Sequence, residues 1–157
     1  MESQNTQLER DEALKSFNND HHHALLLCWK IRKGLNGNID LKRIKKYNDW
    51  YYNNHLKQLL EDEEKFLFPI LGEDNKLIKK TLAEHRRLRR LFKDTKDIMK
   101  SINYIEEELD RNIRFKEREL FVLIQEHATI DQLQNITKNR KEIPFEENTE
   151  DEFWEEG

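Results

Sequence analysis

Apolar residues return every three or four positions along the chain from its N-terminal part to about residue 125. This spacing marks one face of an amphipathic helix. It predicts four long helices, with turns at Gly34–Asn38 and Gly72–Asn75 and a break between Ser101 and Tyr104. Short connections between long helices make neighbours antiparallel. The pattern therefore predicts an all-α fold, an antiparallel up-down four-helix bundle.

The predicted elements divide the chain into three parts. The bundle takes residues 8–128, and its first helix begins at about Leu8 or Leu14. Residues 129–143 add a short C-terminal helix. Residues 144–157 form an acidic tail whose last twelve residues hold seven acids and no base. Such a composition is typical of disordered segments, so a disordered tail is predicted.

Composition excludes several classes of protein. The 157 residues include only four glycines and two prolines, too few turn residues for a fold of many short strands. The single Cys28 excludes an intramolecular disulfide and any zinc site with two or more thiolates. No apolar run approaches the roughly 18 residues of a membrane span, and no leader pattern opens the chain. The sequence therefore predicts a cytoplasmic protein with no membrane partner.

Charge is distributed unevenly around a formal net value of −4. Basic residues gather between Lys76 and Lys93, where most of them fit the solvent face of a helix. An alternative to a disordered tail is that its acids, with Phe153 and Trp154, dock on a basic surface such as this one. No nucleic-acid reader pattern accompanies the basic residues, so no nucleic-acid partner is predicted.

Polar residues on the inner helix faces are the candidate functional groups. A buried polar side chain requires a partner, and bundle cores hold metals with inward-facing His and carboxylate groups. Each residue also has a structural explanation, such as a hydrogen-bonded core histidine or a glutamate at the rim of the core. His21 fits the apolar stripe best, and His22 is the second choice. The polar residues on the otherwise apolar inner faces are His21, His22, His23, His55, Glu63, His85, Asn112, Lys116 and Glu117.

Four segments carrying these residues resemble one known family. They are Asp20–Leu27, Glu63–Leu71, Leu82–Leu88 and Ile113–Phe121. Over about residues 10–128 the chain resembles the hemerythrin-like (HHE cation-binding) family. That resemblance implies a four-helix bundle that usually holds two bridged irons and binds or senses dioxygen or nitric oxide, or handles iron. It carries over one metal ligand from His21 or His22, together with Glu63, His85 and Glu117.

The chain also departs from the family pattern. Leu59 and Asn112 stand where the family usually has histidines, Arg89 stands at the place of a further histidine, and Lys116 replaces a glutamate. His55 lies about 12 Å from Glu63 along the helix axis, too far for both to bind one ion at bond lengths of about 2 Å. A cation near a metal is unfavourable in a low-dielectric core, so Lys116 is expected to pair with Glu63 or Glu117.

Three functions follow as alternatives. The sequence favours a hemerythrin-like protein with a weakened or lost di-iron site that acts as a binding or regulatory module with a protein partner. The main alternative is a non-haem iron protein, mononuclear or dinuclear, that senses or carries a small gas or handles iron. The third is an oxidase or a nitric oxide reducing enzyme. The expected cofactor is accordingly non-haem iron or none, and an enzyme is not favoured.

Overall fold

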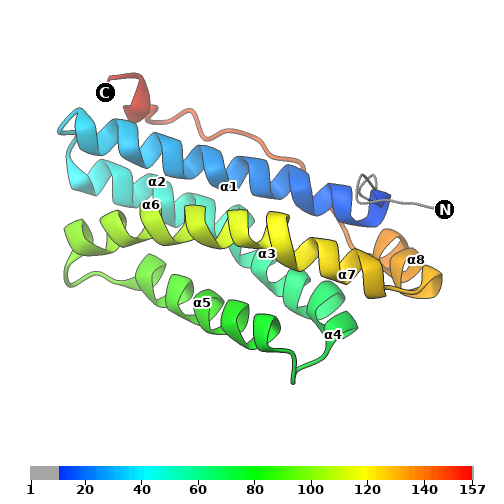
Figure 1. Ribbon diagram of the computed structural model, residues 1–157. Helices are drawn as coiled ribbons and strands as arrows, with labels where there is room; N and C mark the ends of the chain where they lie inside the picture. Colours follow the sequence, from blue (N-terminus) through cyan, green and yellow to red (C-terminus); the bar gives the residue numbers. More distant parts are fainter. Residues whose placement is uncertain (1–10, 157) are drawn as a thin grey trace.

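The computed structural model describes residues 11–156, which form an all-helical bundle without a strand (Figure 1). The all-α prediction is confirmed for these residues, and the predicted start at residue 8 lies outside them. No helix among them is long and apolar enough to cross a membrane. The α-helices are α1 (Glu12–Asn36), α2 (Leu41–Tyr51), α3 (Lys57–Asp62), α4 (Phe68–Leu71), α5 (Lys76–Lys93), α6 (Ile98–Phe115), α7 (Phe121–His127) and α8 (Ile130–Asn139).

Wider helical turns join several of these helices into continuous rods. Within the described residues, π-helical segments at Tyr52–Leu56, Glu63–Leu67 and Lys116–Leu120 connect α2 to α3, α3 to α4 and α6 to α7. A π turn inserts an extra residue and rotates the side chains that follow it, and such turns occur frequently at functional sites. Two of them begin at Glu63 and Lys116, both of which the sequence places at the candidate site.

Side-chain caps fix where the helices begin. The Asp11 carboxylate accepts a hydrogen bond from the backbone N–H of Ala13, and Asp40 caps α2 in the same way. Asn75 accepts from two backbone N–H groups at the start of α5. Thr129 and Gln132 form a reciprocal capping box that begins α8. Each of these caps is a local signal, because the capping side chain lies within three residues of the backbone group that it binds.

The predicted break between Ser101 and Tyr104 is wrong, because α6 runs through it. The chain turns instead at residues 94–97, where the Asp94 carboxylate accepts from the backbone N–H groups of Lys96 and Asp97. The Ser101 hydroxyl also donates to Asp94 over 2.5 Å. Helix α5 therefore ends at Lys93, and Met99 lies on α6, where it is 58% exposed.

The rods lie alongside one another and bury a continuous apolar core. Figure 1 shows α1 and the α6–α7 run packed side by side, with the α2–α4 run and α5 completing the bundle. Leu27 and Ile31 of α1, Leu60 of α3 and Leu109 of α6 are almost fully buried. The polar candidates therefore lie within an apolar interior, where an unpaired charge is strongly unfavourable.

The tail prediction is corrected by the structure, because residues 144–156 pack on the bundle. The segment runs back along α1 from α8 toward the α1–α2 turn (Figure 1). Phe153 is fully buried and Trp154 is 6% exposed. Glu147 accepts a 2.5 Å hydrogen bond from Lys30, and Asp151 pairs with Arg43. These two acids are thus paired with bases of α1 and α2 rather than with the basic residues of α5.

Gly34 supplies the space into which Phe153 fits. A Cβ atom there would lie 2.7 Å from Phe153 Cε1 and 2.9 Å from Ile44 Cδ1. Gly34→Ala is therefore expected to destabilise the protein by about 1–3 kcal/mol despite the better helix propensity of alanine. Urea unfolding checks this, and Phe153→Leu in the same chain should recover part of the loss. Increased stability of the Gly34→Ala variant would contradict the close contact.

Candidate functional site

His21 lies at the centre of the bundle and joins two carboxylates. It is 1% exposed on α1, and its Nε2 lies 2.5 Å from Glu63 Oε2. Its Nδ1 makes a second, short hydrogen bond with Glu117 Oε2. Burial lowers the pKa of His21, but the Glu63 carboxylate and the hydrogen bonds with Glu117 and Glu63 raise it overall. The imidazolium form therefore donates from both ring nitrogens.

Lys116 reaches the other oxygen of the same glutamate. Its side chain is fully buried, and its Nζ donates to Glu63 Oε1 over 2.7 Å. Burial of Glu63 would raise its pKa, but Lys116 and His21 hold that pKa well below its usual range. Glu63 is thus an ionised carboxylate with both oxygens bonded to cationic donors. Charge-assisted hydrogen bonds of this kind are stronger than neutral ones.

His85 continues the network as a neutral imidazole. Its Nε2 lies 3.1 Å from Lys116 Nζ and accepts from that ammonium, while its Nδ1 donates to Glu64 Oε2 over 2.7 Å. Burial and then the Lys116 charge lower the pKa of His85 to about 4. Arg89 Nη1 lies 2.9 Å from the same Glu64 oxygen. The network therefore has three cations, on His21, Lys116 and Arg89, that face three carboxylates.

Other predicted residues lie outside this network. His22 is exposed, and His55 packs against Trp50 and Tyr51 with ring centroids 5.3 and 5.8 Å away. The amide of Asn112 donates to Glu84 Oε1 over 2.8 Å, and its own Oδ1 is buried without a partner. Leu59 is 2% exposed. The two positions where the family pattern has histidines thus contribute an apolar wall and an amide.

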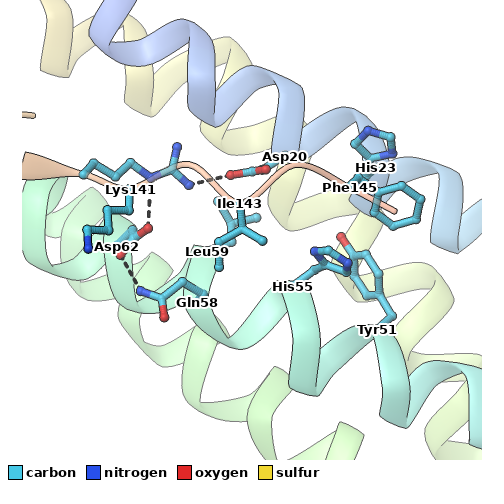
Figure 2. A pocket seen from close by; sticks show the side chains of 11 residues that line it. Asp20, His23, Tyr51, His55, Gln58, Leu59, Asp62, Lys141, Ile143 and Phe145 are labelled. Atoms are coloured by element: carbon cyan, nitrogen blue, oxygen red, sulfur yellow. Dashed lines mark hydrogen bonds and ion pairs between the residues drawn. The ribbon is translucent and has the colours of Figure 1, made fainter. Parts of the chain in front are cut away.

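A small cavity lies against the residues that precede the network. It has a volume of about 20 Å³, enough for about one water molecule, and its lining includes Asp20, Asp62, Leu59 and His55 (Figure 2). Asp20 and Asp62 come directly before His21 and Glu63 in the chain. Arg140, which follows α8, donates to both of these aspartates. Arg140, at the end of α8, therefore joins α1 to α3 beside the site.

Sequence reasoning missed two parts of the site. Glu64 was not singled out, although it directly follows Glu63, because consecutive helical residues point about 100° apart and only one fits the inner stripe. In the structure Glu63 faces Lys116 while Glu64 faces His85. Arg140 gave no local signal at all, since its partners lie 78 and 120 residues away along the chain.

Residues 12–132 of the chain match the family model of the hemerythrin HHE cation binding domain. The chain belongs to the hemerythrin HHE family. Neither the curated proteins nor the solved structures include a match to this chain. The family model describes a cation-binding domain, and the residues that it matches include His21, Glu63, His85 and Glu117.

The donor set of this hemerythrin-family bundle does not fit a metal centre. Both Glu63 oxygens and both His21 nitrogens are bonded to protein groups. The lone pair of His85 Nε2 faces an ammonium, which would repel a metal cation. Among residues 11–156, no three His, Cys, Asp or Glu side chains are arranged to hold a metal ion. Lys116 Nζ lies between Glu63 Oε1 and His85 Nε2 and contacts both.

The neutral His85 predicts acid sensitivity. Its pKa in the folded protein, about 4, lies below the ordinary value of 6.5, so the unfolded chain binds the proton first as the pH falls. The free energy of unfolding should therefore decrease between pH 6.5 and pH 4. His85→Gln should flatten this decrease in urea titrations, whereas the exposed His127→Gln should not. Equal pH profiles for wild type and His85→Gln would count against a neutral buried His85.

Proposed function

We propose that this hemerythrin-family protein has lost its di-iron centre and works as a binding or regulatory module. Its helical rods would keep the antiparallel four-helix arrangement of the family as a scaffold. A buried network of protein charges stands in for the metal, and no catalytic role is proposed. The soluble, cytoplasmic setting that the sequence predicts is part of this proposal.

One observation carries the proposal. The ammonium of Lys116 is fully buried and lies between Glu63 Oε1, at 2.7 Å, and His85 Nε2, at 3.1 Å. The cation between the buried Glu63 carboxylate and the buried His85 imidazole is therefore a side chain of the protein itself. The network balances its charges without an added ion. Buried ion pairs of this kind add little net stability but can fix which helices face each other.

The direct test is the metal content of tag-free protein purified from iron-supplemented cells. We expect no stoichiometric iron. We also expect no oxo-bridge absorption band after anaerobic iron addition and exposure to air, and no change in melting temperature on adding iron. About two irons per chain would contradict the proposal, since a bridged pair needs several His and carboxylate ligands.

A matched variant tests whether Lys116 is what excludes the metal. Lys116→Glu removes the ammonium and places a carboxylate beside Glu63 and His85. Neutral imidazole and carboxylate together suit iron, manganese or zinc. We therefore expect added Fe(II) or Zn(II) to raise the melting temperature of Lys116→Glu but not that of the wild type. The same metal response in both proteins would show that Lys116 does not block the site.

The second candidate is a metal protein that senses or carries a small gas such as dioxygen or nitric oxide, or handles iron. Its support is the match to a cation-binding family together with the meeting of His21, Glu63 and Glu117 in one network. A single bound ion that His85→Ala or His21→Ala removes would favour it over the first candidate. Turnover of either gas by purified protein would instead favour an enzyme.

A further inference from the structure

Acidic residues of the C-terminal segment pair with bases on α1 and α2. Lys30 Nζ donates to Glu147 Oε2 over 2.5 Å, and Tyr47 donates to the other Glu147 oxygen. Arg43 donates to both oxygens of Asp151, over 2.6 and 2.8 Å, and also to Glu156. Planar guanidinium–carboxylate pairing of this kind selects geometry as well as charge. The face of α1 and α2 is therefore complementary to an acidic peptide.

Aromatic rings anchor the same segment. Phe153 lies over Gly34 and is fully buried, and its ring centroid is 5.8 Å from that of Tyr47. The Lys30 ammonium lies 4.4 Å from the Trp154 ring centroid, a cation–π distance. The ring centroids of Phe145 and His23 are 4.2 Å apart and the rings are stacked. Figure 2 shows the two rings next to each other. Buried aromatic anchors with charged pairs around them resemble the energetic centre of a protein–protein interface.

The segment is held by side chains rather than by its backbone. Among the described residues, no backbone–backbone hydrogen bond joins residues 141–156 to the helices. Most side chains from Lys141 to Glu150 are exposed. The segment is thus held by its acidic and aromatic side chains. Another extended peptide with such side chains at a suitable spacing can make the same contacts. Tethering gives the segment an effective concentration in the millimolar range, so it competes strongly with any such peptide.

We propose that this face of α1 and α2 is a docking groove for an acidic peptide segment of another protein that carries a pair of aromatic residues. Residues 145–156 are its intramolecular, competing occupant. This inference rests on the proposed function, because a binding module needs a binding surface. The chemistry of the groove indicates which class of partner binds there. Release of the segment would open Lys30, Arg43 and the space beside Gly34.

The experiment uses the full chain and a fluorescent synthetic peptide with the sequence of residues 145–156 as the probe. Phe153→Ala with Trp154→Ala should release the chain's own segment while leaving the groove intact. We expect fluorescence anisotropy to show peptide binding at least about tenfold tighter to this variant than to the wild type. Arg43→Glu in the released variant should abolish the gain, whereas Lys42→Glu, an exposed neighbour on α2, should not.

Amide exchange of residues 145–156 and circular dichroism accompany the binding measurement. Loss of protection in the segment with a retained helical spectrum is the expected result. A segment that stays protected, or a released variant that binds the peptide no better than the wild type, overturns the proposal. Stable dimers that exchange their segments would assign the groove to a second copy and also overturn it. Metal content is unaffected by any of these results, so failure here is distinct from failure of the proposed function.

Discussion

Replacing Lys116 with methionine is expected to destabilise the protein by about 3–5 kcal/mol. The ammonium is one of two cationic partners of Glu63, whose side chain is fully buried. Methionine has a similar length and fills the space, so the main change is the loss of charge. Glu63 Oε1 then stays buried without its donor, and a buried group without a partner is unfavourable.

Urea unfolding of Lys116→Met and of the exposed control Lys79→Met provides the comparison. The control should change stability by no more than about 0.5 kcal/mol. Glu63→Gln combined with Lys116→Met should be less destabilised than the sum of the two single variants, because the double change also removes the buried carboxylate charge. Additive single changes would show that Lys116 and Glu63 do not interact.

Replacing Arg140 with methionine is expected to cost about 3 kcal/mol at neutral pH. The guanidinium is 4% exposed, donates to Asp20 over 2.5 Å and to Asp62 over 2.9 Å, and lies 3.8 Å from the Phe17 ring centroid. Removal leaves two partly buried carboxylates on different helices without their shared donor. The helices that carry His21 and Glu63 would then lose the Arg140 hydrogen bonds that join them beside the site.

The pH dependence of this loss identifies its cause. Burial raises the pKa of Asp20, and the Arg140 hydrogen bond opposes that rise. Without Arg140 the pKa in the folded state should rise further above the unfolded value of 3.8. The stability deficit should therefore be largest at neutral pH and shrink as Asp20 becomes protonated on acidification. A deficit that does not change with pH would indicate lost packing on Phe17, and Lys138→Met serves as an exposed control.

Part of the site follows from the sequence because its residues fall on helical stripes. His21, Glu63 and His85 stand at inner positions of amphipathic segments, and the structure places all three in one buried network. The sequence left open whether Lys116 pairs with Glu63 or Glu117, and the structure gives Glu63. His55 and Asn112 lie on the same kind of stripe, but His55 packs against aromatic rings and Asn112 donates to Glu84. A helical stripe determines which face is buried but not which residues meet across the core.

The C-terminal segment shows where sequence reasoning was wrong. Judged by its own composition, the segment has too little apolar area to fold and enough like charge to repel itself. Its order depends on Lys30 and Arg43, which lie more than 100 residues earlier in the chain. Gly34 also has a role that the sequence did not show. The sequence places it in a turn that ends the first helix, whereas in the structure its missing side chain leaves the space that Phe153 fills.

The sequence by itself determined the all-helical fold class and the family resemblance, because periodicity and short motifs act over a few neighbouring residues. Only the tertiary structure decided that Lys116 lies between Glu63 and His85, and that Arg140 and the acidic segment pack against α1. Those contacts join residues from 31 to 120 positions apart. Their partners are selected by packing and by the need to neutralise buried charge, which no local pattern records.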